Sequence, residues 1–252
     1  MTTTIDLNAD MGESFGAWKV GDGVDPGIMP LISSANIAAG FHAGDPSTML
    51  ETLRLASRYG VSVGVHPGFR DLVGFGRRPI LAAADELVND VLYQMGALRE
   101  LARLEGLELS HFKLHGALFM HAAQDEAFAE KLTAALVTVA PHLSVYCLAG
   151  TALDKAAESV GLSRVHEFYA DRDYNDEGSI MFVRNVQRLD PQQVAQKVLR
   201  ACQEGKVETV SGQQVAVQFQ SICIHSDTPG ALSLVQAVRE SLDNAGINVA
   251  AH

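Results

Sequence analysis

Short apolar runs alternate with amphipathic segments along most of the chain. A short apolar run is typical of a buried parallel strand, and apolar residues spaced three or four apart are typical of a helix that packs on a sheet. The alternation predicts parallel strands joined by helices. Strands are predicted at residues 5–10, 33–38, 61–65, 112–114, 143–147, 164–168 and 221–225.

Helix boundaries follow from capping residues and prolines. An acidic or hydroxyl residue followed by proline predicts the start of a helix, and a glycine after the last apolar position predicts its end. The predicted helices run from Asp45 and Pro46 to Gly60, over residues 87–102 with a stop near Gly106, near 152–160, from Asp190 and Pro191 through 199, and from Thr228 and Pro229 through 242.

Seven strand and helix steps predict an α/β fold. We expect an incomplete or distorted (β/α) barrel of seven strands, of the glycoside hydrolase and deacetylase type, and a doubly wound open sheet is the alternative. Residues 207–210 and 215–219 flank the segment SGQQ and predict a β-hairpin before the final strand. No linker divides the chain, so we expect residues 1–252 to form a single domain.

Composition narrows the function classes. Of the 252 residues 47% are apolar, and 30 acidic against 19 basic residues give a net charge of −11. This charge opposes binding to nucleic acid or anionic lipid. The N-terminal residues lack a secretion signal, and no apolar run approaches the roughly 20 residues that span a bilayer. We expect a cytoplasmic protein with no nucleic-acid or membrane partner, and the sequence leaves homo-oligomerisation open.

Four histidines share one local design. Each ends a short apolar run, with Gly, Pro or a carboxylate within three residues downstream, and they are His42, His66, His115 and His225. In α/β folds the loops at the C-terminal ends of the strands carry the chemistry, so we expect the four imidazoles to meet at one rim. The remaining histidines lack this context and are expected at the surface or behind the site: His111, His121, His142, His166 and His252.

The first strand carries an alternating polar pattern. In DLNADMGE, Asp6, Asn8 and Asp10 lie on one face of a strand, and Glu13 follows after Gly12. Burying carboxylates without partners is very unfavourable, which favours a site that pairs or metallates them. The alternative is that Asp6 or Asn8 only ties strands together at the barrel floor.

Two further polar groups suit a divalent metal and an anion. If Asp10, His42 and His66 converge, they form a one-oxygen, two-nitrogen ligand set for Zn²⁺ or a similar ion. Lys113 lies two residues before His115, so both face the same side of a strand, and Lys113 needs a carboxylate partner or an anionic ligand. The alternative is a lysine that extends to solvent.

Two loops carry concentrated charge. Residues 167–174 place Asp171 and Arg172 directly after a strand, where Arg172 suits a carboxylate or phosphate and Asp171 suits a base or an orienting group. The glycine-rich segment VHPGFRDLVGFGRR carries Arg70, Arg77 and Arg78, which predicts a mobile lid that brings positive charge to an anion.

Six strings in order along nearly the whole chain resemble the LamB/YcsF family, the A subunits of 5-oxoprolinase. They are DLNADMGES, SSANIAAGFHAGDP, GVHPGFRD, KLHGALF, FYADRDY and ICIHSDTP. The resemblance implies a deacetylase-like incomplete (β/α) barrel and ATP-dependent cleavage of 5-oxo-L-proline to L-glutamate, together with partner subunits B and C. The chain departs from the family pattern at Ser226, where we expect Gly, and at Leu114, where we expect Pro.

Ring opening of a lactam needs an activated carbonyl, an activated water and a protonated leaving nitrogen. ATP would activate the carbonyl by phosphorylating its oxygen, although the chain contains no GxxxxGK[ST] or GxGxxG string. The candidate bases are Asp10, Glu13, Asp171 and a rim histidine, and the candidate acids are His115 and His225, with Asp227 fixing a tautomer. The substrate and its carboxylate would contact Asn8, Asn36, Arg70, Lys113 and Arg172.

Two other functions remain open at this point. The chain would act as a stand-alone, metal-dependent hydrolase of an N-acyl or carbohydrate amide, or as a non-catalytic ligand-binding or scaffolding subunit. The first predicts activity with metal and without ATP. The second predicts that His→Ala changes at the rim leave turnover of the assembled complex intact.

Overall fold

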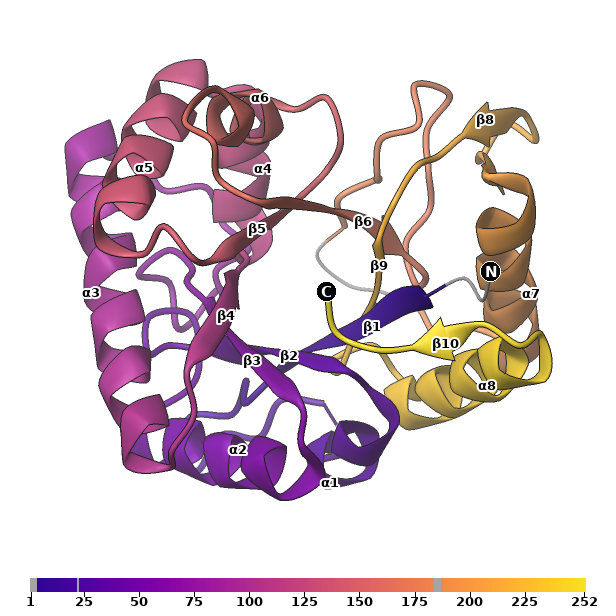
Figure 1. Ribbon diagram of the computed structural model, residues 1–252, viewed down its shortest axis with the longest axis horizontal. Helices are drawn as coiled ribbons and strands as arrows, with labels where there is room; N and C mark the ends of the chain where they lie inside the picture. Colours follow the sequence, from indigo (N-terminus) through magenta and orange to yellow (C-terminus); the bar gives the residue numbers. More distant parts are fainter. Residues whose placement is uncertain (1–3, 22, 184–186) are drawn as a thin grey trace.

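Seven parallel strands form a closed barrel, and helices pack around its outside (Figure 1). The computed structural model describes residues 4–21, 23–183 and 187–252. The barrel strands pair in chain order, and the last one pairs with the first. Closure confirms the predicted seven-stranded α/β barrel and excludes the open sheet. The barrel strands are β1 (Thr4–Met11), β2 (Ser34–Ala38), β3 (Ser62–His66), β4 (Leu109–Phe112), β5 (Ser144–Cys147), β6 (Arg164–Tyr169) and β9 (Ser221–His225).

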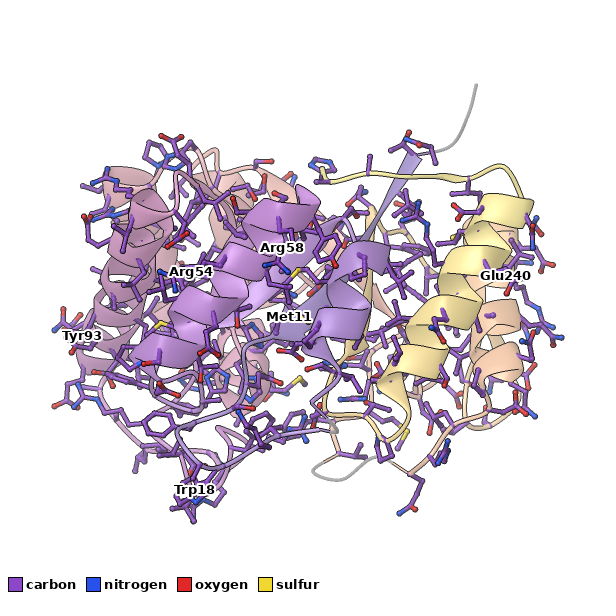
Figure 2. The ribbon with its side chains drawn as sticks, turned by 90° about the horizontal axis from the view of Figure 1, so that it is seen from below. Met11, Trp18, Arg54, Arg58, Tyr93 and Glu240 are labelled. Carbon is purple, nitrogen blue, oxygen red and sulfur yellow. The ribbon has the colours of Figure 1, made fainter. Side chains whose placement is uncertain are left out.

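The helices enclose the barrel, with α3 and α5 on the left of Figure 1, α2 at the bottom and α7 and α8 on the right. Seen from below, α2 and α8 run across the outer surface, and their labelled side chains Arg54, Arg58 and Glu240 are exposed (Figure 2). The helical elements are α1 (Asp25–Ile28), the 3₁₀ turn η1 (Met29–Leu31), α2 (Pro46–Tyr59), α3 (Ala84–Leu104), α4 (Gly116–Gln124), α5 (Glu126–Val139), α6 (Ala152–Ser159), α7 (Pro191–Glu204) and α8 (Ala231–Asn244).

Three short strands complete the fold. The predicted hairpin exists but is shorter than expected, because only β7 (Lys206–Glu208) and β8 (Gln214–Ala216) pair antiparallel. The last strand, β10 (Asn248–Val249), pairs in parallel with the first residues of β1. The chain therefore returns at its end to the N-terminal side of the barrel strands, opposite the ends that carry the predicted chemistry.

Two predicted helix starts are confirmed by their caps. The carboxylate of Asp45 accepts from the main-chain nitrogens of Ser47 and Thr48 at 3.0 Å and 3.3 Å, and α2 ends at Gly60 with φ +67°. Asp190 caps α7 in the same way. These local signals fix where each helix meets the strand before it, and so where the strand's last residue lies.

The predicted start of the last helix is wrong. The helix begins at Ala231 and not at Thr228 with Pro229, and its N-cap is Gly230 with φ +82° and no side-chain cap. The hydroxyl of Thr228 instead donates to Asp171 Oδ2 at 2.6 Å. A tertiary contact has replaced the expected cap, and local sequence rules do not include such contacts.

Polar side chains fill the barrel, and the apolar residues between them on the same strands join the surrounding core. At the floor, Asp6 accepts from four hydroxyl groups, those of Ser33, Ser34, Tyr146 and Ser221, at distances of 2.5–2.9 Å. The expectation that Asp6 ties strands together at the floor agrees with these contacts. Polar layers above it lead up to the site at the other end.

Candidate active site

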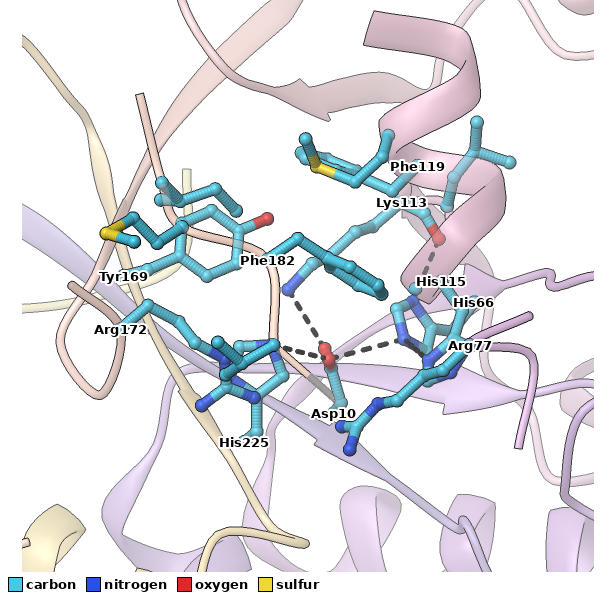
Figure 3. A pocket seen from close by; sticks show the side chains of 16 residues that line it. Asp10, His66, Arg77, Lys113, His115, Phe119, Tyr169, Arg172, Phe182 and His225 are labelled. Atoms are coloured by element: carbon cyan, nitrogen blue, oxygen red, sulfur yellow. Dashed lines mark hydrogen bonds and ion pairs between the residues drawn. The ribbon is translucent and has the colours of Figure 1, made fainter. Parts of the chain in front are cut away.

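A cavity with an empty volume of about 460 Å³ opens at the C-terminal ends of the barrel strands (Figure 3). Asp10 lies at its centre, with Lys113 on one side and His66 and His225 on two others. The lining residues come from five strands or from the segments after them. They are Asp10, His66, Arg77, Lys113, Leu114, His115, Gly116, Phe119, Met120, Tyr169, Arg172, Ile180, Met181, Phe182, Val183 and His225.

The structure brings three of the four predicted histidines into direct contact. The rings of His42 and His115 stack with centroids 3.8 Å apart, and His66 lies edge-on to both. Glu13 faces all three, with its Oε1 at 3.4 Å from His42 Nε2, 3.2 Å from His115 Nδ1 and 3.9 Å from His66 Nε2. All four side chains are buried. The fourth histidine, His225, lies across Asp10.

The tautomers of two rings follow from their outer contacts. His66 Nδ1 lies 2.9 Å from the carbonyl of Lys113, and His115 Nε2 lies 2.8 Å from the carbonyl of Phe75. A carbonyl only accepts, so these two nitrogens donate. In neutral rings the inner nitrogens, His66 Nε2 and His115 Nδ1, then carry lone pairs, and they face each other at 3.0 Å. Two facing lone pairs require a proton or a cation between them.

Burial keeps this cluster neutral on the histidine side. Burial and the neighbouring His115 lower the pKa of His42 to about 3, and burial also lowers the pKa of His115. Burial alone would raise the pKa of Glu13, but hydrogen bonds with His115 and His42 outweigh it and hold that pKa below its usual range. The cluster therefore combines neutral imidazoles with an ionised carboxylate, which is the protonation state that metal ligands adopt.

The cluster fits a divalent metal. Among the described residues, Glu13 Oε1 and both ring nitrogens of His42 are buried without a hydrogen-bond partner. The ligand atoms of Glu13, His42, His66 and His115 all lie within 4.8 Å of one another. One carboxylate oxygen and three imidazole nitrogens suit Zn²⁺ or a similar ion, and the outer carbonyl contacts are those that orient metal-bound histidines.

The grouping differs from the predicted Asp10, His42 and His66. Asp10 Oδ2 lies 3.3 Å from His66 Nε2, but Asp10 is grouped with Cys223 and His225 and not with the His42 cluster. Glu13 takes that place because Gly12, with φ +68°, turns the chain after β1. The Gly-Glu pair directly after the strand was the sequence signal for this carboxylate.

Lys113 is a buried cation between carboxylates. Its Nζ lies 2.9 Å from Asp10 Oδ1, 3.1 Å from Glu167 Oε1 and 3.0 Å from Cys223 Sγ, and only 1% of the residue is exposed. The alternative of a lysine that extends to solvent is therefore wrong. Burial would lower the pKa of Lys113, but Asp10 and the other acids raise it well above its usual value, so the side chain stays an ammonium. The pKa of Asp10 lies well below its usual value because His66 and Lys113 outweigh its burial.

The two asparagines lie beneath the cavity. Asn36 Nδ2 donates to Asn8 Oδ1 at 2.7 Å and to Asp10 Oδ1 at 2.8 Å, and Asn8 Nδ2 donates to Glu167 at 3.0 Å. His111 Nε2 contacts Asn36 Oδ1 at 2.8 Å. Neither asparagine is among the described residues that line the cavity. They hold the carboxylates above them instead of facing a ligand.

His225 is oriented by Asp171. Its Nδ1 lies 3.0 Å from Asp171 Oδ1, and its Nε2 points to Asp10 Oδ2 at 3.5 Å. Asp171 also accepts from Thr228 and from Arg172 NH1, the latter at 2.9 Å. Burial would raise the pKa of Asp171, but His225 and Arg172 lower it far below its usual range. The carboxylate stays ionised and fixes the imidazole beside the cavity.

The glycine-rich loop divides its arginines between the cavity and the surface. Arg77 lines the cavity, and its NH2 lies 2.7 Å from Asp227 Oδ2. Arg70 lies outside, with 66% of its side chain exposed, where it pairs with Asp90. The structure therefore does not bring Arg70 to the site. Arg77 takes that place, and sequence spacing alone does not distinguish the two.

The same loop packs tightly against the histidine cluster. Gly76 has φ +61°, and a Cβ there would lie 2.7 Å from His115 Cδ2 and 2.8 Å from His42 Cβ. Phe75, with φ +53°, places its carbonyl against His115. A glycine at position 76 therefore allows the main chain to reach the cluster closely enough to fix one ring.

Comparison with known proteins agrees with the geometry. The sequence model of the LamB/YcsF family matches residues 5–252. The chain belongs to the LamB/YcsF family. Two relatives are named as A subunits of 5-oxoprolinase: the first of two numbered forms in Pseudomonas aeruginosa, 61% identical over 99% of both chains, and that of Brevibacillus brevis, 46% identical over 98% of both chains.

A solved LamB/YcsF-like structure has the same architecture. The lactam utilization protein from Thermus thermophilus is 44% identical, covers 99% of this chain and 100% of its own, and superposes with a TM-score of 0.91. No described helix is both long and apolar enough to span a bilayer.

Sequence reasoning missed part of the LamB/YcsF cavity. Cys223 was expected only as a small core residue, yet its sulfur accepts from Lys113. The apolar wall formed by Ile180, Met181, Phe182 and Val183 follows no strand or helix pattern. A loop segment without periodicity gives no signal of what it covers.

Proposed function

We propose that this protein is the A subunit of an ATP-dependent 5-oxoprolinase, which opens 5-oxo-L-proline to L-glutamate. The observation that carries the proposal is the near full-length identity of 61% with a protein named as a 5-oxoprolinase A subunit. The cavity supports it, because it combines a carboxylate-binding region with acid and base groups and an apolar wall. Each of these features has a part in lactam ring opening.

The cavity has a polar and an apolar side that match a carboxylated lactam. Arg77 and Arg172 flank Asp10 in Figure 3 and supply guanidinium groups for the substrate carboxylate. Phe119 and Phe182 supply flat apolar surface for the methylene carbons of the ring. Such a site favours a lactam that carries a carboxylate over one that does not.

Proton transfer is assigned to two residues on opposite sides of the substrate position. Asp10, ionised and held by Lys113 and Asn36, accepts a proton from the attacking water. His225, held by Asp171, delivers a proton to the leaving nitrogen. The Asp171 carboxylate stabilises the protonated imidazole and keeps Nε2 directed into the cavity.

A divalent metal would be held by Glu13, His42, His66 and His115. When bound, it would lower the pKa of a water molecule and polarise the lactam carbonyl. The chain contributes the neutral rings, the ionised carboxylate and the carbonyl contacts that orient His66 and His115.

ATP and the partner subunits complete the proposal. Phosphorylation of the lactam oxygen by ATP makes the resonance-stabilised carbonyl carbon susceptible to water. The chain carries no phosphate-binding glycine loop of the two common types, so we assign nucleotide handling to subunits B and C or to a site formed with them.

A component assay tests the proposal. The purified protein is mixed with 5-oxoproline and assayed for glutamate, with and without ATP, subunits B and C, and a chelator. We expect glutamate only in the complete, ATP-containing mixture, and less of it after chelation. Glutamate without ATP would overturn the ATP-dependent assignment.

The Glu13 and histidine cluster also favours a second candidate, a stand-alone metal-dependent amide hydrolase. This candidate predicts hydrolysis of an N-acyl substrate by this chain and metal alone, which the same purified protein tests. Unchanged turnover of the complex by a His66→Ala variant would instead favour a scaffolding role.

A further inference from the structure

Lys197 of α7 holds the loop that follows β6. Its ammonium donates to the main-chain carbonyls of Tyr169, Ala170 and Arg172, at 3.4 Å and 3.2 Å for the first two. These three acceptors lie within four consecutive residues. One side chain from a distant helix therefore fixes the main chain where β6 ends and the site begins.

Two aromatic rings complete this cage. Lys197 Nζ lies 5.1 Å from the ring centroid of Tyr174 and 5.6 Å from that of Phe168. Burial lowers the pKa of Lys197 to about 8, although Asp171 and Asp173 partly oppose the shift. A lysine that served only solubility would keep its ammonium in water. Its placement against carbonyls indicates that the loop conformation matters.

The caged segment carries the residue that orients His225. Asp171 lies between the caged carbonyls, and its carboxylate contacts both Nδ1 and the main-chain nitrogen of His225 at 3.0 Å and 3.2 Å. His225 Nε2 in turn faces Asp10 at 3.5 Å. A shift of the loop by about 1 Å would misplace the imidazole, and such shifts cost about 100-fold in rate.

We propose that Lys197 is a positioning residue for lactam ring opening, because its ammonium holds residues 169–172 so that Asp171 keeps His225 directed toward Asp10. The inference rests on the proposed function, in which His225 protonates the leaving nitrogen. Lys197 acts through the loop and does not touch the substrate. It lines a separate groove of about 1750 Å³, which shares Asp171 and Arg172 with its own wall.

Chemical rescue tests this role. In a complex assembled with the Lys197→Ala variant of this chain, we expect kcat for glutamate formation to fall about 100-fold. Propylammonium replaces the deleted atoms and can enter from the groove, so it should restore kcat saturably to within about tenfold of the wild type. Tetramethylammonium at the same ionic strength has no N–H donor and should restore nothing.

Arg200→Ala is the matched control. Arg200 lies on the same helix and borders the same groove, but its side chain is half exposed and lies 3.6 Å from Glu208. We expect wild-type turnover with and without propylammonium. Recovery that is specific to the Lys197 variant then identifies the carbonyl cage as the place where the amine acts.

A spectroscopic measurement separates positioning from folding. In the isolated chain labelled with ¹⁵N-histidine, the ring signals of His225 should shift in Lys197→Ala and return with propylammonium. Wild-type kcat in Lys197→Ala, or a folded variant whose lost activity no amine restores, would overturn the inference. If the alanine variant does not fold, Lys197→Met, which keeps most of the volume, takes its place. Wild-type kcat with unshifted His225 signals in that variant would overturn the inference equally.

The two proposals fail in different ways. If the wild-type complex forms no glutamate, the proposed function fails, whereas the ring signals of His225 still report whether Lys197 holds the loop.

Discussion

The floor and the mouth of the barrel both bury carboxylates, but they satisfy them differently. At the floor, Asp6 accepts from four hydroxyl groups, and each donor is matched to an acceptor. At the mouth, Glu13 Oε1 and both nitrogens of His42 have no hydrogen-bond partner among the described residues. The floor is complete as folded, and the mouth is complete only with a bound cation or substrate.

This difference shows how one strand serves two purposes. Asp6 and Asp10 lie on the same face of β1, four residues apart. The first is surrounded by neutral donors that only hold strands together, and the second by Lys113 and two histidines that titrate or bind. Chemistry therefore depends on the type of neighbour and not on burial alone.

The largest expected effect is on turnover at the mouth. Asp10→Asn keeps the shape of the side chain but removes the base, so kcat should fall roughly 100- to 10,000-fold. His115→Ala should cause a comparable loss. Rates of glutamate formation by the assembled complex measure both, and His142→Ala, at an exposed position, is the control. An equal loss in the control would indicate a stability effect.

At the floor, the expected effect is on stability. Asp6→Ala leaves four buried hydroxyl groups without their acceptor, which should lower the free energy of unfolding by about 3 kcal/mol. Urea denaturation measures the change. Activity per folded molecule should stay within a few-fold of the wild type. Unchanged stability would contradict the view that Asp6 closes the floor.

Metal binding should stabilise the mouth alone. At a free Zn²⁺ concentration of about 100 times its Kd, linkage predicts an increase of about 2.7 kcal/mol in the free energy of unfolding. Glu13→Gln removes the charged ligand and should lose most of this increase, whereas Asp6→Asn should keep it. Thermal unfolding with and without metal tests the pair, and an identical metal response in all three proteins would argue against the cluster.

A smaller effect concerns acid stability. The folded-state pKa of Asp171 is depressed, because His225 and Arg172 outweigh its burial. Its contribution is therefore fully present above the unfolded-state pKa of about 3.9 and is lost as the pH falls below that value. Asp171→Asn should be less stable than the wild type at pH 7, and the difference should shrink by pH 3. Denaturation curves at the two pH values provide the comparison.

The smallest effect is expected in the loop arginines. Arg70→Met removes an exposed ion pair, so stability should change by less than about 0.5 kcal/mol and KM for 5-oxoproline should not change. Arg77→Met should raise that KM by about tenfold or more, because a guanidinium at the cavity is lost. If both variants raise KM equally, the loop acts as a whole and not through Arg77.

Local patterns predicted the frame of the molecule well. Period-two polarity in β1 and the Asp45 and Asp190 caps depend on neighbours in sequence, and the structure agrees with them. Glu13 and Arg77 were harder to assign, because their positions depend on how a turn and a loop fold back on the barrel. Thr228 was wrongly assigned as a cap for the same reason.

The short β10 strand determines how the protein can be held. It pairs with Thr4 and Ile5, so both ends of the described chain lie on the side of the barrel away from the cavity. A surface tether or fusion domain attached at either end would therefore leave the cavity entrance facing solution. Single-molecule or biosensor measurements of substrate entry can use such attachment without obstructing the entrance.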